Sequence, residues 1–116
     1  MPAAHIAAIV GRVLIALLFI LAGVAKILGP KPFLAHMAEF KVPGFLLVGV
    51  IGLEIGGGLA VLAGWALPYS AGALAVFCVA TAAVFHARLS ERAERTLFFK
   101  DLAIAGGLMA IAAGAL

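Results

Sequence analysis

Four long apolar runs, separated by polar or turn residues, divide the chain. A helix needs about 20 apolar residues to cross the hydrocarbon core of a bilayer, and each run has about that length. The breaker pairs Gly29-Pro30 and Pro43-Gly44 bound the connection between the first two runs. The pattern predicts one all-α domain over residues 1–116, an integral membrane four-helix bundle. We expect its helices at about residues 5–28, 44–64, 67–87 and 97–116.

A further pattern lies in the connection between the first two runs. Phe33, Met37 and Phe40 recur there at helical spacing, while Glu39 and Lys41 fall on other sides. This arrangement is typical of a short amphipathic helix that lies in the membrane interface. A plain connecting loop between prolines is the alternative.

The composition of the chain agrees with a membrane environment. The 116 residues are 66% hydrophobic and 11% charged, whereas a soluble domain is about half apolar and a quarter charged. A chain this short exposes too much surface to bury so many apolar side chains in a core of its own. A water-soluble protein is therefore excluded, and the lipid bilayer is the partner that the sequence requires.

The distribution of basic residues predicts the orientation in the membrane. Lys31 and Lys41 lie in the first connection, and three arginines between residues 88 and 95 lie in the third. Loops rich in Lys and Arg stay on the cytoplasmic side, so we expect both basic loops to be cytoplasmic and both termini extracytoplasmic. The net charge is +3, but no basic patch alternates with exposed aromatic residues, so nucleic acid is not a predicted partner.

Small residues recur along one edge of the second long run. Gly52, Gly56, Ala60 and Gly64 share that edge. Lipid tails compete for large apolar side chains, so helices in a membrane associate through small residues that let their backbones approach. We expect this edge to make close contacts within one bundle, with a dimer face as the alternative.

Charged side chains inside the apolar runs are the candidate functional residues. Each costs a few kcal/mol to place in a membrane, so such residues persist when they are paired, hydrated or functional. By their distance from the helix ends, Arg12 and Glu54 fall near one level, and we predict an ion pair between them. A second polar cluster is expected toward the cytoplasmic boundary. The buried polar candidates are Arg12, Lys26, Glu54, His86, Lys100 and Asp101.

The residues of the second cluster have a structural and a functional interpretation. Lys26 and Lys100 have long stems that reach the headgroups, which would make them interface anchors. Asp101 is expected to partner one of these lysines or protonated His86, whose charge can change near neutral pH. The functional alternative is a proton-accessible pocket of Glu54, His86 and Asp101 that hydrogen-bonds a quinone.

Motifs of soluble enzymes are missing from the sequence. It contains no Ser-His-Asp arrangement, glycine-rich phosphate loop or metal-ligand spacing, and Cys78 is its single cysteine. The three histidines fall at different levels, so no pair is placed to hold a haem across the core. We therefore predict no metal site. Enzyme activity is left open, and the sequence favours none for the chain on its own. Its catalytic residues, if any, are unknown, and quinone is the one cofactor left open.

Four segments of the chain resemble the DoxX family of small four-helix membrane proteins. They are RVLIALLFILAGVAK (residues 12–26), LEIGGGL (53–59), ATAAVFH (80–86) and FKDLAIAGGL (99–108). The polar positions match as well as the hydropathy, and the segments follow the same order over essentially the whole chain. The family is bacterial and archaeal. It takes its name from subunits associated with a terminal oxidase, and the related DoxD proteins belong to a thiosulfate:quinone oxidoreductase.

The resemblance implies a location and a set of functions. The chain is expected in the inner (cytoplasmic) membrane as a multi-pass protein. Its implied role is an accessory or scaffold subunit of a membrane redox or envelope complex, with other membrane protein subunits or further copies of itself as partners. A quinone-linked oxidoreductase component and a small-solute transporter are the alternatives.

Overall fold

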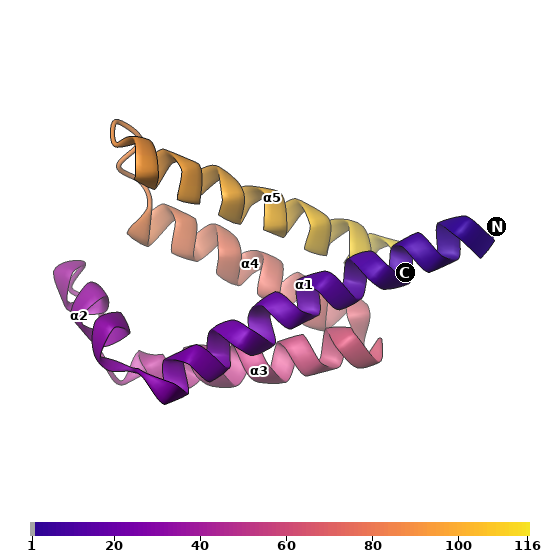
Figure 1. Ribbon diagram of the computed structural model, residues 1–116, viewed down its shortest axis with the longest axis horizontal. Coiled ribbons are helices and arrows are strands. Elements are labelled where there is room, and N and C mark those ends of the chain that lie inside the picture. Colours follow the sequence, from indigo (N-terminus) through magenta and orange to yellow (C-terminus); the bar gives the residue numbers. More distant parts are fainter. Residues whose placement is uncertain (1) are drawn as a thin grey trace. The chain divides into compact units, whose positions relative to one another are not determined.

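The computed structural model describes residues 2–116, which are helical apart from short connections and contain no strand. Four of the helices are long and apolar enough to cross a membrane. The prediction of an all-α protein with four membrane-spanning helices is therefore confirmed. The helices are α1 (Pro2–Leu28), α2 (Lys31–Glu39), α3 (Leu46–Ala63), α4 (Leu67–Phe85) and α5 (Arg92–Gly114) (Figure 1).

The start of α5 differs most from the helix bounds expected from the sequence. The apolar run begins near Leu97, but the helix begins at Arg92 and follows Glu91 as its N-cap. Arg, Ala and Glu are good helix formers, and Glu94 in the first turn suits the positive end of the helix dipole. The apolar pattern marks the part of the helix that suits lipid and misses the polar turns before it.

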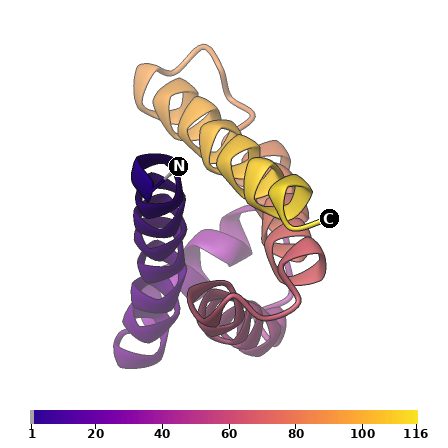
Figure 2. The ribbon, with the colours of Figure 1, turned by 90° about the vertical axis from the view of Figure 1, so that its right-hand side faces the viewer.

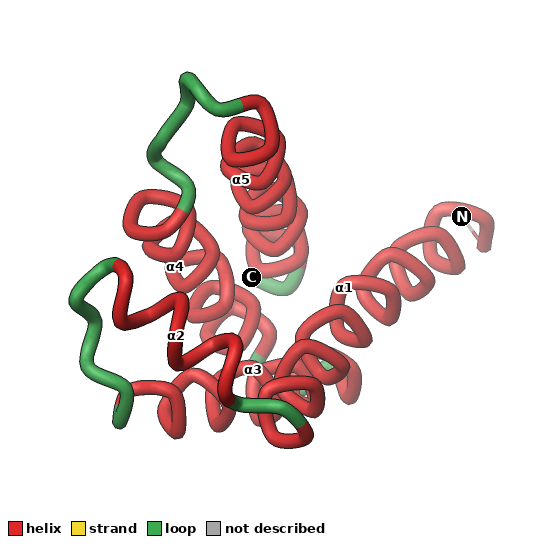
Figure 3. Tube along the Cα trace, turned by 60° about the vertical axis from the view of Figure 1, so that its left-hand side comes forward, coloured by secondary structure: helices red, strands yellow, loops and turns green. Residues whose placement is uncertain are grey.

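The amphipathic segment after the first long helix forms the short helix α2. Pro32 lies in its first turn, where the missing amide hydrogen costs nothing. Met37 is its buried residue, and Lys41 follows the helix with a positive φ of 57°. Short loops connect α2 to α1 on one side and to α3 on the other (Figure 3). The helix predicted here is confirmed, and its position in the interface stays a prediction.

The described residues form two compact units, 2–66 and 67–116. The first unit holds α1, α2 and α3, and the second holds α4 and α5. In each unit two long helices lie side by side and run antiparallel, α1 with α3 and α4 with α5 (Figures 1 and 2). The single domain over residues 1–116 stays a prediction.

The contact between α1 and α3 depends on two glycines. A Cβ added at Gly58 would lie 2.9 Å from Cγ1 of Ile20 and 3.2 Å from the carbonyl oxygen of Ala16. A Cβ added at Gly23 would collide with the side chain of Ile55. Two helix backbones approach this closely only where a side chain is absent. Gly23 and Gly58 therefore set the spacing of the first unit.

Gly52 and Gly56, two members of the small-residue edge predicted on the second long helix, do not face α1, whereas Gly64 at the end of that edge contacts Arg12. A Cβ added at Gly52 or Gly56 would meet no atom of α1 or α2 within 4 Å. Gly58 lies two residues beyond Gly56, which places it about 200° away around the helix. Spacing identifies which small residues share an edge, but it does not say which edge faces the neighbouring helix.

The core of the second unit is built mainly from small and medium apolar residues. On α4 they recur at spacings of three and four residues, which places them on one face of the helix. Leu74 and Leu108 are fully buried within this core. The buried residues are Ala71, Leu74, Ala75, Cys78 and Ala82 on α4, and Ala105 and Leu108 on α5.

Candidate functional site

A buried ion pair joins α1 to α3. Lys26 Nζ lies 2.8 Å from Glu54 Oε1. Glu54 is 4% exposed, and it is the one charged residue in the buried class within residues 2–116. Glu54 Oε1 receives no well-directed hydrogen bond from any of those residues, so the contact is a charge interaction. This oxygen therefore keeps the capacity to accept a further hydrogen bond.

The ion pair predicted between Arg12 and Glu54 is wrong. The Cβ of Glu54 lies level with Gly23, one turn from Lys26, whereas Arg12 lies eleven residues from Gly23, about 16 Å along the helix axis. Side chains on a helix lean toward its N-terminus. Because α1 and α3 are antiparallel, Lys26 and Glu54 lean toward each other and Arg12 leans away.

Arg12 instead lies at the C-terminal end of α3. A Cβ added at Gly64 would be 3.1 Å from Arg12 Nη1, and Gly64 ends α3 in the left-handed conformation, with φ 73°. The C-terminus of a helix carries a partial negative charge, which suits a guanidinium group. The Nε atom of Arg12 is buried and has no hydrogen-bond partner among the described residues.

An aromatic ring of α2 is a second partner of the Lys26 ammonium. The Nζ atom lies 4.9 Å from the centroid of the Phe33 ring, a distance typical of a cation–π contact. The ammonium group therefore contacts both a carboxylate of α3 and an aromatic face of α2. Sequence reasoning gave Lys26 the role of an interface anchor, but its side chain is 16% exposed and is held by these two partners.

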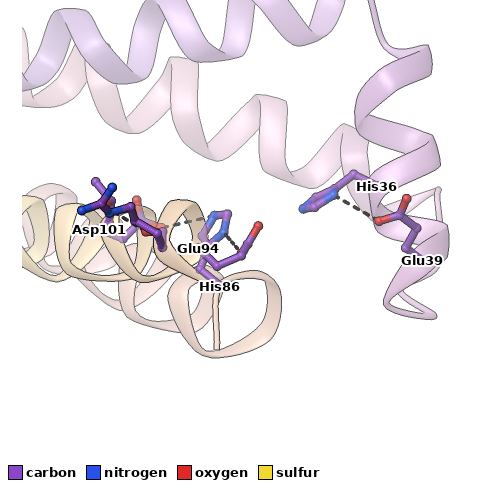
Figure 4. Close-up of polar contacts among 7 residues, drawn as sticks. His36, Glu39, His86, Glu94 and Asp101 are labelled. Carbon is purple, nitrogen blue, oxygen red and sulfur yellow. Dashed lines mark hydrogen bonds and ion pairs between the residues drawn. The ribbon is translucent and has the colours of Figure 1, made fainter. Parts of the chain in front are cut away.

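A histidine between two carboxylates forms the polar cluster of the second unit (Figure 4). His86 Nδ1 lies 2.9 Å from Glu94 Oε2, which is hydrogen-bond length. His86 Nε2 lies 3.8 Å from Asp101 Oδ2, which is an ion-pair distance when the imidazole is protonated. About a fifth of each of these side chains is exposed. Of the partners proposed for Asp101, the structure brings His86 to it.

Glu94 is the member of this cluster that sequence reasoning missed. It falls in the charged stretch that was interpreted as a loop, but α5 already includes it. Glu94 and Asp101 are seven residues apart, so they share one face of the helix. That spacing is the signal in the sequence that would have placed the two carboxylates on one face of the helix.

The remaining polar residues are peripheral to these two sites. Lys100 is exposed, as an interface anchor requires. His36 Nδ1 lies 3.7 Å from Glu39 Oε2 on the surface of α2 (Figure 4), and an exposed pair of this kind contributes little to stability. Glu54 belongs to the first unit and the His86 cluster to the second, so a shared pocket of Glu54, His86 and Asp101 stays a prediction.

Comparison with known proteins agrees with the family resemblance. Residues 7–87 match the DoxX family. Over 104 residues the chain is 41% identical to "Inner membrane protein YqjF" of Escherichia coli (strain K12), a match that covers 90% of this chain and 80% of that protein. No solved structure shows a significant match. The relative and the four apolar helices together place the chain in the inner membrane, and the chain belongs to the DoxX family.

Proposed function

We propose that this chain is an accessory subunit that binds another protein of the inner membrane, within a redox or envelope complex. The four long helices contain most of the described residues, and the connections between them are short. A protein of this form presents helix faces to the lipid and little structure outside it. Binding within the bilayer is therefore the interaction to which its surface is best suited.

The open edge of α3 is the observation that carries this proposal. Gly49, Gly52 and Gly56 share this edge, and a Cβ added at any of them would meet no atom of α1 or α2 within 4 Å. Val48 and Leu59 lie along one side of the edge and are 77% and 51% exposed. A smooth glycine edge beside exposed apolar side chains lets a second helix approach closely, which is how helices associate in membranes.

Gentle solubilisation of native membranes, followed by mass spectrometry of everything that co-purifies with the chain, tests this proposal. We expect a stoichiometric membrane protein in the wild-type sample and its loss in Gly52→Leu and Gly56→Leu. Gly11→Leu is the matched control, because a Cβ there also meets nothing within 4 Å but lies on α1.

Two outcomes would contradict the proposal. Recovery of the chain only as a free monomer or homo-oligomer would show that it binds no other membrane protein. A lower melting temperature of purified Gly52→Leu would show that the open edge packs inside the chain, because a leucine that faces lipid leaves the folded protein unstrained.

A second candidate function, a quinone-linked oxidoreductase component, is favoured by the His86 cluster. Reduction of a quinone to a quinol takes up two electrons and two protons. A redox enzyme bound to the chain would supply the two electrons. His86 beside Asp101 can pass one proton to a quinone oxygen and, after taking up another from water, pass the second to the other oxygen. The second carboxylate, on Glu94, would hold the imidazole in place.

The amount of quinone that co-purifies with the protein tests this second candidate function. We expect His86→Ala to lose bound quinone and His36→Ala to retain it, because His36 lies on the exposed surface of α2 and pairs only weakly with Glu39. Equal quinone content in wild type and His86→Ala would remove this candidate and leave the accessory role untouched.

A further inference from the structure

We propose that the Lys26 ammonium occupies a binding site for small primary alkylammonium cations, which the chain fills with its own side chain. A carboxylate oxygen lies 2.8 Å from the Nζ atom, and the centroid of an aromatic ring lies 4.9 Å from it. A carboxylate together with an aromatic face is the combination by which proteins recognise ammonium groups. The site is thus built for an ammonium group, whether that group is tethered or free.

The burial of Glu54 explains why this site needs a cation. Its carboxylate is 4% exposed, and an unpaired charge at such a position is strongly unfavourable. Glu54 cannot reach the headgroups from the middle of α3. If Lys26 leaves, the Glu54 carboxylate must be neutralised by another cation or by a proton, so an external ammonium can exchange with Lys26 at this carboxylate.

The position of Lys26 allows that exchange. It lies two residues before Leu28, where α1 ends, and its side chain is 16% exposed. A lysine stem near a helix end can move its ammonium out to the headgroup layer at little cost. The Lys26 side chain therefore has a second favourable position, whereas the Glu54 carboxylate has none.

The contacts of the site also restrict the ligand. Glu54 Oε1 has room for a further hydrogen bond, so a ligand with N–H donors is preferred over a quaternary ammonium. Gly23 admits the Ile55 side chain next to Glu54, which keeps the surroundings narrow and apolar. A short primary alkylammonium fits these conditions, and a neutral alcohol of equal size lacks the charge that Glu54 requires.

The binding of n-propylammonium tests the proposal, because this cation has the atoms that Lys26→Ala removes. Thermal unfolding of purified Lys26→Ala is measured in detergent with n-propylammonium or with n-propanol. We expect a lower melting temperature for the variant, restored by n-propylammonium and not by n-propanol. Lys26→Met is the matched control, since its side chain fills the same space without charge and should not respond.

Two further variants identify the groups that hold the cation. In Lys26→Ala/Glu54→Gln no charge is left buried, so this protein should fold well and show no response to n-propylammonium. Phe33→Leu in the Lys26→Ala background should weaken the response about threefold or more, because the cation–π contact is lost. If n-propylammonium still raises the melting temperature of Lys26→Ala/Glu54→Gln, the cation does not bind at Glu54 and the proposal is wrong.

Wild-type protein decides whether the site accepts an external ligand. Lys26 competes there, so the apparent affinity should be about tenfold or more weaker than in Lys26→Ala. We still expect n-propylammonium to shift the wild-type melting temperature more than n-propanol does. An equal effect of the two compounds on wild type at every concentration would overturn the proposal, even if Lys26→Ala responds.

Discussion

Glu54 Oε1 lies 2.8 Å from Lys26 Nζ, and this contact ties the middle of α3 to the last turn of α1. The two residues lean toward each other because their helices are antiparallel and each side chain is directed to its own N-terminus. The same contact extends to α2 through the ring of Phe33. All three helices of the first unit therefore meet at one ammonium group.

Removal of the Glu54 carboxylate should destabilise the protein far more than removal of an exposed charge. Glu54→Ala should lower the free energy of unfolding by about 2–4 kcal/mol, because truncation of this buried side chain leaves a cavity and removes the ion pair, even though the Lys26 ammonium can move to the headgroups. Lys100→Ala should change it by about 0.5 kcal/mol or less, since Lys100 is exposed. Equal melting temperatures for the two variants in one detergent would contradict this interpretation.

The close approach of α1 and α3 predicts where a large side chain is tolerated. Gly58→Leu should destabilise the protein by about 1–3 kcal/mol, because its side chain would overlap Ile20 and the Ala16 carbonyl. Gly52→Leu is the control, since no atom of α1 or α2 lies near that position. Denaturant unfolding of both variants in the same detergent measures the difference, and a Gly58→Leu protein as stable as wild type would rule out the contact.

The His86 cluster should hold the first turns of α5 against the end of α4. His86→Ala removes the hydrogen bond to Glu94 and the ion pair with Asp101. We expect a loss of about 1 kcal/mol, reduced by the partial exposure of all three side chains. Hydrogen exchange at residues 95–98, whose amides are the first of α5 with a partner in the helix, should become faster in this variant and stay unchanged in His36→Ala. Unchanged exchange in both would show that the cluster does not stabilise α5.

The distribution of basic residues makes a separate prediction about topology. In a Cys78→Ala background, Ser90→Cys should lie on the cytoplasmic side and Ala115→Cys on the opposite side. A membrane-impermeant maleimide applied to intact spheroplasts should therefore label Ala115→Cys alone. Labelling of Ser90→Cys in intact spheroplasts would show that the protein has the opposite orientation in the membrane.

Hydrophobic pattern alone predicted the four long helices, because an apolar run of spanning length has few other stable forms. It also predicted α2 from the spacing of Phe33, Met37 and Phe40. The start of α5 could not be found in this way, since the residues from Arg92 onward are polar and helical at once. The hydrophobic pattern indicates whether a residue favours lipid or water, but it does not indicate where a helix begins.

The polar residues were found by type, but their partners were partly mistaken. An ionisable residue inside an apolar run is recognised directly from the sequence, so Glu54 and His86 were both predicted as candidates. The partner of Glu54 depends on the axial offset of α1 and α3, which Gly23 and Gly58 fix through contacts that no spacing rule shows. Side-chain lean, which follows from helix direction alone, would have favoured Lys26 over Arg12.

A double-mutant cycle of Lys26→Met and Glu54→Gln tests most directly whether these two residues form the central buried pair of the first unit. Lys26→Met should be the more harmful single change, because it leaves the Glu54 charge buried without a partner. The double variant leaves no charge unpaired and should regain most of the lost stability, with a coupling energy of about 2 kcal/mol or more. Unfolding free energies that add to within about 0.5 kcal/mol would contradict the pair.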